Sequence, residues 1–225
     1  MTVTTTPSLT IAMITLNEEK AVERVIHEIR RAAPAAEILL VDSSRDATPH
    51  IPAALGARVI RQFPPKGYGP AMDLALRSAS GAVVVTLDCD DTYPADRIPE
   101  LVRLVLEEGY DIVDASRLRA KPAAMPWLNY VANYGFPLLA SILFFRRITD
   151  LHSGMRAYRK SILDSLVYKP EGAALPVELL LRPIKLGLNV KTVFIDYRAR
   201  IGESTMLPLP SAWWTLKRIL HVRFN

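Results

Sequence analysis

Short apolar segments alternate with segments of helical spacing through the first 115 residues, and this alternation constrains the fold more than any other feature of the chain. Five apolar segments, rich in Ile, Val and Leu, predict strands. They are residues 9–16, 37–41, 58–60, 82–87 and 110–115. The segments with helical spacing are 21–33, 51–55, 72–79 and 98–107. Strands that alternate with helices form βαβ units, so we expect an α/β fold with a mostly parallel central sheet flanked by helices.

The second half of the chain is less regular. Helices are predicted near 160–166, 177–185 and 211–224, and a strand at 189–195. We find no internal repeat and no low-complexity linker that would divide the chain. A length of 225 residues is sufficient for one large α/β domain, so we expect residues 1–225 to form a single domain.

The composition narrows the classes of function. Hydrophobic residues make up 50% of the chain, which predicts a packed globular protein rather than a disordered one. The formal net charge of +5 suits an anionic partner such as a phosphate or an acidic membrane surface, but it is too small to argue for nucleic acid. A single cysteine, Cys89, excludes an internal disulfide, and residues 1–8 lack the pattern of a secretory signal. We therefore expect a cytoplasmic protein.

Residues 122–145 contain no charged side chain. A helix that crosses a membrane needs about 20 apolar residues, so the length of this run would suffice. However, Pro122, Pro126 and Pro137 interrupt the run, and proline breaks or kinks a helix. We therefore expect one or two helices near 122–147 that lie on a surface, either that of the protein's own core or that of a membrane.

Polar clusters follow three of the predicted strands, at 17–19 (NEE), 42–44 (DSS) and 88–91 (DCDD). Ligands of parallel sheets bind at the carboxyl ends of the strands, so the coincidence of these clusters predicts a site. The neighbouring carboxylates of the third cluster repel each other unless a cation neutralises them. Mg²⁺ or Mn²⁺ bridging a pyrophosphate would do so. The alternative is a solvated acidic turn that caps the helix beginning near Asp96.

Several blocks of sequence occur in one order along almost the whole chain. They are 14–19 (ITLNEE), 40–48 (LVDSSRDAT), 66–67 (KG), 88–94 (DCDDTYP), 116–117 (SR), 150–156 (DLHSGMR), Glu178 and 197–204 (YRARIGES). In this ordered set the chain resembles glycosyltransferase family 2, and within it the dolichyl- and polyprenyl-phosphate mannose synthase branch. Each block would be a weak signal by itself, whereas the ordered set is specific.

The resemblance implies a GT-A (Rossmann-like) fold in which residues 1–116 bind a nucleotide sugar and residues 117–225 bind the acceptor. Asp42 would contact the nucleobase, Glu18 the ribose and Lys66 a donor phosphate. Alternatively, Asp42 is a turn residue that bonds its own backbone, Glu18 is a solvated residue in the first turn of a helix, and Lys66 lies in a basic loop. The implied donor-binding set is Leu16, Glu18, Asp42, Lys66, Asp88, Cys89 and Asp90. The implied metal ligands are Asp88, Asp90 and Asp91.

The acceptor phosphate would bind to arginines in the later blocks, because arginine grips phosphate through paired, charge-assisted hydrogen bonds. The implied set is Arg117, Ser153, Arg156, Arg200 and Ser204. The alternative for each arginine is a salt bridge. Asp90, Arg117 and Arg200 would act in catalysis. The chain has Leu16, Thr92 and Thr205 where many relatives carry an aromatic residue, a glutamine and a lysine.

The expected reaction is inverting transfer of a hexose, mannose before glucose, from GDP-mannose or UDP-glucose to a polyprenyl or dolichyl phosphate. A phosphate acceptor is already anionic and needs no base, whereas a hydroxyl acceptor would need one, for which His152 is a candidate. Two other hypotheses are a soluble glycosyltransferase acting on a hydroxyl group and a nucleotide-binding domain without catalysis. Aromatic and basic residues in 122–147 and 211–224 predict peripheral attachment to the cytoplasmic face of a membrane.

Overall fold

The computed structural model describes residues 8–123, 125–202 and 208–225. Seven strands form one sheet in the order β3-β2-β1-β4-β6-β5-β7. The strands are β1 (Leu9–Thr15), β2 (Glu37–Asp42), β3 (Arg58–Arg61), β4 (Val83–Thr86), β5 (Ile112–Ser116), β6 (Arg156–Arg159) and β7 (Val190–Phe194). All the pairings are parallel except those of β6, which is antiparallel to β4 and β5. The predicted α/β architecture with a mostly parallel sheet is confirmed.

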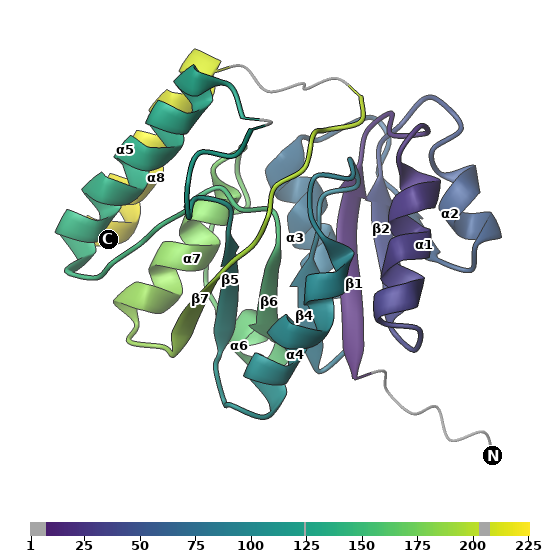
Figure 1. The fold of residues 1–225 in the computed structure, drawn as a ribbon, viewed down its shortest axis with the longest axis horizontal. Helices are drawn as coiled ribbons and strands as arrows, with labels where there is room; N and C mark the ends of the chain where they lie inside the picture. Colours follow the sequence, from purple (N-terminus) through teal and green to yellow (C-terminus); the bar gives the residue numbers. More distant parts are fainter. Residues whose placement is uncertain (1–7, 124, 203–207) are drawn as a thin grey trace.

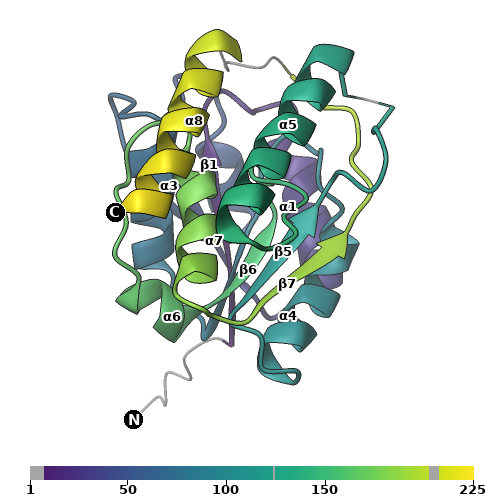
Figure 2. The same cartoon turned by 90° about the vertical axis from the view of Figure 1, so that its left-hand side faces the viewer.

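Helices cover both faces of the sheet (Figures 1 and 2). On one face, α1 (Val22–Ala32) and α4 (Ile98–Leu106) pack on the odd-numbered residues of β1 and β4. The other face is covered by α3 (Tyr68–Ser78), α6 (Lys160–Ser165) and α7 (Leu175–Lys185). The short α2 (His50–Ala54) lies beside α1, and a single 3-10 turn (Ala95–Arg97) precedes α4. The alternating burial follows from the two-residue period of a strand, which sends successive side chains to opposite faces.

The charge-free run forms one helix, α5 (Trp127–Phe144), which contains Pro137. It lies side by side with α8 (Pro208–Phe224), and the two helices form an outer layer against α7 (Figures 1 and 2). The guanidinium of Arg218 on α8 pairs with the buried carboxylate of Glu178 on α7, which also accepts from Arg182 at 2.6 Å. Within the described residues, no helix is long and apolar enough to cross a membrane.

The register of the parallel strands brings the predicted polar clusters together. Thr15 lies beside Asp42 in the β1–β2 pair, and Ala12 lies beside Thr86 in the β1–β4 pair. The three strands therefore end at the same edge of the sheet, which is uppermost in Figure 1. The loops that follow them carry residues 17–19, 43–48 and 88–91.

Two details differ from the sequence prediction. The helix α3 begins at Tyr68 rather than near Met72, directly after Gly67, whose φ of 95° is readily adopted only by glycine. The strand β6 was not predicted, because two of its four residues are arginines and interrupt the apolar pattern. Arg156 can occupy a buried strand because its guanidinium is paired inside the protein, as described below.

Candidate active site

Asp42 ends β2, the strand between β3 and β1, and is 0% exposed. Its carboxylate accepts hydrogen bonds from the hydroxyls of Thr15 (2.6 Å) and Ser44 (2.7 Å), and it pairs with the guanidinium of Arg61. The protein therefore occupies the acceptor positions of this carboxylate, which ties β1, β2 and β3 together at their ends. Direct contact between Asp42 and a nucleobase would require one of these donors to leave.

The acidic turn after β4 separates its carboxylates. One oxygen of Asp90 accepts from the backbone N–H and the hydroxyl of Thr92, at 3.2 and 2.6 Å. Asp91 has a φ of 67° and lies 3.3 Å from Arg24 of α1 and 3.6 Å from Arg198. Because two arginines already neutralise Asp91, we leave this residue out of the metal-binding set that we propose below.

Asp88 is the carboxylate of the turn that the protein does not neutralise directly. No described residue donates a hydrogen bond to it or forms an ion pair with it. Burial raises the pKa of Asp88 to about 7, and the charge of Asp90 adds to this rise, while Arg117 and Arg200 oppose it. Its carboxylate lies against Gly154, where any Cβ atom would overlap it. An uncompensated carboxylate beside a second one is the chemistry that attracts a cation.

Residues 197–202 follow β7 and lie along the acidic turn. The backbone N–H groups of Arg198 and Ile201 donate to the carbonyls of Thr92 and Asp90, both at 3.0 Å. The side chain of Arg200 donates to Glu18 at 2.8 Å and lies 3.4 Å from the carboxylate of Asp90. Arg200 therefore connects the loop after β1 with the acidic turn after β4.

Arg117 forms a second cationic position at the end of β5. Its guanidinium donates two hydrogen bonds to Asp150, at 2.7 and 2.9 Å, and lies 5.3 Å from the ring of Tyr197. Burial by itself would raise the pKa of Asp150, but the charge and hydrogen bonds of Arg117 hold it below the ordinary value. Tyr197 also stacks edge-on against Tyr93 at 5.7 Å. The segment 197–202 thus touches both Arg117 and the acidic turn.

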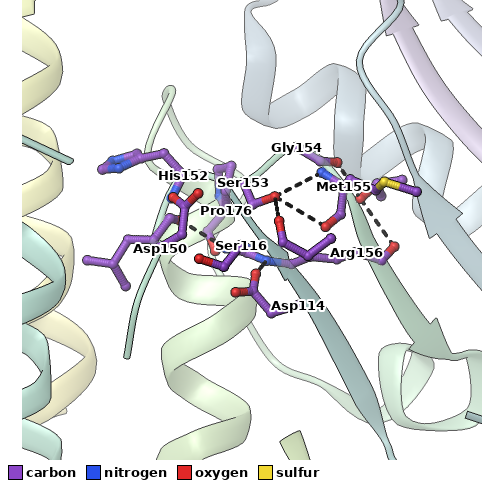
Figure 3. Close-up of polar contacts among 12 residues, drawn as sticks. Asp114, Ser116, Asp150, His152, Ser153, Gly154, Met155, Arg156 and Pro176 are labelled. Carbon is purple, nitrogen blue, oxygen red and sulfur yellow. Dashed lines mark hydrogen bonds and ion pairs between the residues drawn. The ribbon is translucent and has the colours of Figure 1, made fainter. Parts of the chain in front are cut away.

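Arg156 does not face this edge. It is 1% exposed, and its guanidinium donates to Asp114 (2.5 Å), to the carbonyl of Leu151 (3.1 Å) and to that of Pro176. Figure 3 shows this enclosure between Asp114 and the backbone of Pro176. Because Arg156 is enclosed and bonded inside the protein, we leave it out of the acceptor-binding set that we propose below.

Ser153 is likewise turned inward. Its hydroxyl donates to the carbonyl of Ala115 at 2.5 Å and accepts from the backbone N–H of Met155 at 3.3 Å (Figure 3). It is 2% exposed, so it shapes the loop and is not free for an acceptor phosphate. The next residue, Gly154, donates its N–H to the hydroxyl of Tyr93 at 2.7 Å. The loop 153–155 therefore fixes Gly154 against Asp88.

His152 lies outside the strand-end site. In Figure 3 its imidazole points away from the segment 153–156, and its Nε2 lies 2.8 Å from the hydroxyl of Thr215 on α8. The ring also meets Phe136 of α5 edge-on, with centroids 6.4 Å apart. Burial lowers the pKa of His152 to about 4, so the ring is neutral at pH 7. A catalytic base must reach the acceptor, and His152 is used between the helices instead.

The remaining predicted residues occupy varied positions. Leu16 is 38% exposed beside the site and Lys66 is exposed before α3. Cys89 is buried, and burial together with the nearby carboxylates raises the pKa of its thiol well above the ordinary value. Ser204 lies outside the described residues.

Sequence reasoning did not identify the contacts through which four residues build the site. Thr92 donates to Asp90, and Asp150 accepts from Arg117. Gly154 leaves room for the carboxylate of Asp88, and the ring of Tyr197 lies between Arg117 and Tyr93 of the acidic turn. Each of the four lies inside one of the ordered blocks of sequence, and this location was the one feature of the sequence that could have pointed to a role in the site. Their roles depend on contacts between residues far apart in the chain, which no local pattern displays.

Comparison with known proteins points to the same family as the ordered blocks of sequence. Residues 10–167 match the family described as glycosyl transferase family 2. The chain is 42% identical to a dolichyl-phosphate hexose transferase of Haloferax volcanii, over 99% of this chain and 96% of that protein. It is 31% identical to the low-salt glycan biosynthesis hexosyltransferase Agl6 of the same organism, over 97% of this chain and 53% of that protein.

Solved structures share the fold at lower sequence identity. Glucosyl-3-phosphoglycerate synthase from Mycobacterium tuberculosis, in complex with Mn²⁺, uridine diphosphate and phosphoglyceric acid, is similar with a TM-score of 0.76. The similarity extends over 97% of this chain and 79% of that chain, at 24% sequence identity.

The neutral state of His152 predicts a dependence of stability on pH. Its pKa is about 4 in the folded protein and 6.5 when unperturbed, so the unfolded chain binds the proton first as the pH falls below 6.5. We expect the wild-type protein to lose up to about 3 kcal/mol of unfolding free energy between pH 6.5 and 4, relative to His152→Gln. Urea unfolding of both proteins across this range measures the difference, in which the effects of carboxylates cancel. Parallel curves for the two proteins would contradict the prediction.

Proposed function

Because the chain belongs to glycosyl transferase family 2, we propose that it transfers a hexose from a nucleoside-diphosphate sugar to a polyprenyl phosphate, with Mg²⁺ or Mn²⁺ at Asp88 and Asp90. The fold is the GT-A fold. The observation that carries the proposal is the position of Asp88, an unneutralised carboxylate at the strand ends, close enough to Arg117 and Arg200 for both charges to lower its pKa. This arrangement would offer a cation site close to two arginines that could bind anions.

The donor set of oxygen atoms suits a hard divalent cation. Asp88 has no partner among the described residues, and Asp90 has one oxygen held by Thr92 and the other 3.4 Å from Arg200. The described residues contain no group of three or more ligating side chains, so an ion here would complete its shell with donor phosphates and water. When bound, the ion would stabilise the charge of the departing nucleoside diphosphate. A protein of the same fold was crystallised with Mn²⁺ and uridine diphosphate.

The acceptor side favours a phosphate over a hydroxyl group. Arg117 uses two N–H groups on Asp150, which fixes the guanidinium and leaves its remaining N–H groups for an anion. A phosphate monoester carries its own negative charge and attacks without a base. The one histidine considered for a base, His152, is turned to Thr215 of α8. The relative named as a dolichyl-phosphate hexose transferase supports the same acceptor class. Mannose is the first candidate for the sugar and glucose the second.

The outer surface of α5 and α8 supports attachment at a cytoplasmic membrane face. Large apolar side chains recur along one side of α5 and remain exposed. They are Trp127, Val131, Tyr134, Leu138, Ile142 and, at the end of the helix, Phe145. On α8, Trp213 is exposed and carries the ammonium of Lys217 4.9 Å from its ring centroid. Aromatic rings beside cations suit the interface between headgroups and lipid tails.

We predict that Asp88→Asn and Asp90→Asn each reduce sugar transfer by about a hundredfold or more, because each removes a charge that would hold the metal ion. Asp91→Asn is the matched control, since Asp91 pairs with Arg24 and Arg198 instead. Transfer from GDP-mannose and UDP-glucose is measured with Mn²⁺, with Mg²⁺ and with a chelator, and thermal unfolding confirms that the variants fold. Full activity in the chelator would remove the metal from the proposal.

We predict that Arg117→Lys raises the KM for polyprenyl phosphate about tenfold or more while the KM for the donor stays nearly constant. Lysine keeps the positive charge beside Asp150 but loses the planar pair of donors. Arg198→Lys is the control on the neighbouring segment. The assay compares polyprenyl phosphate with polyprenol and with 3-phosphoglycerate as acceptors. Equal increases in both KM values, or a preference for polyprenol, would contradict the phosphate site at Arg117.

We predict that replacing Trp127, Ile142 and Phe145 by serine abolishes flotation with anionic vesicles without loss of stability, because the exposed fractions of 66%, 63% and 88% show that the core does not contain these side chains. The control replaces Leu106 and Leu186, exposed apolar residues of other surfaces, by serine. Unfolding of the triple variant would place these residues in the core. Flotation equal to that of the wild type would contradict the membrane surface.

A further inference from the structure

A second pocket lies away from the strand-end site and contains none of the residues assigned to the donor or the acceptor. It is formed between the end of α5, the helix α7 and the strand β7, which adjoin one another in Figure 2. Its volume is about 180 Å³. Pockets for drug-sized ligands occupy roughly 300 Å³ or more, so this pocket suits a small group.

Two cationic side chains line this pocket, those of Arg146 and Arg147. Neither of them forms an ion pair with an acidic side chain of the described residues. Arg146 is held in place by a hydrogen bond to the carbonyl of Val190 at 2.5 Å. Lys191 contributes only its backbone, because it is in register with Val113 and its ammonium lies over Tyr110 on the face of the sheet that α4 covers.

The acidic residue of the pocket is already neutralised. Asp114 lines the pocket, but its carboxylate accepts from Arg156 at 2.5 Å, within the enclosed contact of Figure 3. Because the charge of Asp114 is neutralised in this way, Arg146 and Arg147 give the pocket its net positive charge. A concave surface lined by one sign of charge attracts the opposite sign.

A hydroxyl of the pocket also lacks a partner. Oγ1 of Thr149 is buried and forms no hydrogen bond with any described residue. A buried hydroxyl without a partner is costly, and most such groups are bonded in folded proteins. Guanidinium and hydroxyl groups together are hydrogen-bond donors of the kind that bind a phosphate oxyanion. From this combination we propose that the pocket binds a phosphate group, with Arg146, Arg147 and Thr149 as its contacts.

The phosphate group has two possible sources. The exposed apolar side of α5 ends at Phe145, which directly precedes the two arginines, so a lipid inserted along α5 would bring its headgroup to the pocket. A free phosphate ester in solution carries the same oxyanion. The chemistry of the site is common to both sources, and the experiment below separates them.

Inorganic phosphate is the first probe, titrated into the full chain and followed through backbone amide resonances. We expect saturable shifts at residues 146–149 and 190–192, with a dissociation constant that rises about tenfold or more in the variant Arg146→Gln plus Arg147→Gln. The matched control is Arg31→Gln plus Arg103→Gln, which removes the same charge from α1 and α4 on the opposite face of the sheet. The control should bind phosphate as the wild type does.

Vesicles provide the second probe and identify the source. Phosphatidylcholine vesicles with and without phosphatidylglycerol are compared in flotation for the wild type and both double variants. A selective loss of binding to the anionic vesicles in Arg146→Gln plus Arg147→Gln assigns the pocket to a lipid headgroup. Unchanged flotation, with phosphate affinity still reduced, assigns it to a free phosphate ester.

The proposal is overturned if phosphate shifts no resonance at 146–149 and 190–192, or if the two double variants bind phosphate equally. Phosphate binding at Arg117 is distinguishable, because it would shift Asp150 and Tyr197 and would persist in Arg146→Gln plus Arg147→Gln. Donor hydrolysis by the same variant separates this proposal from the proposed transferase reaction. Failure of phosphate binding at the pocket leaves the reaction at Asp88 and Asp90 unaffected.

Discussion

Repulsion between carboxylates collected at one edge of a parallel sheet is the constraint on which the site depends. The protein answers most of these charges with arginines of its own: Asp42 meets Arg61, and Asp150 meets Arg117. Asp90 and Asp91 meet arginines of the segment 197–202. Asp88 has no such partner among the described residues, and burial raises its pKa to about 7. The place that the protein leaves without a counter-ion is the place that suits a metal ion.

The second half of the chain completes this edge from a distance. The antiparallel strand β6 enters the sheet between β4 and β5, so the loop before it carries Gly154 against Asp88. The same strand buries Arg156 on Asp114, a pair that tolerates its interior position because several hydrogen bonds surround it. After β7 the chain returns across the edge and brings Arg200 to Glu18. The outer helix α8 is joined to α7, which covers the sheet, through the pair of Arg218 and Glu178.

Predictions from the sequence succeeded where a local pattern had one physical meaning. Alternating strand and helix patterns determined the parallel sheet, and the direction of its strands placed the clusters at 17–19, 42–44 and 88–91 on one edge. The ordered blocks identified the family. Predictions for single side chains were weaker. Arg156 and Ser153 lie in the same block as Gly154, yet both are turned into the interior. Asp91 is adjacent to Asp90 but faces Arg24 and Arg198.

The sequence by itself determined the architecture and the edge at which the polar clusters meet, because hydrophobic periodicity and strand direction act over a few residues, while its ordered blocks carried the resemblance to the family. Only the tertiary structure decided which charges are neutralised within the protein and which remain for a ligand. An arginine binds phosphate or a carboxylate with the same donors, so its role depends on the nearest anion. For Arg156 that anion is Asp114, 42 positions away in the chain, a distance over which no local pattern specifies a contact.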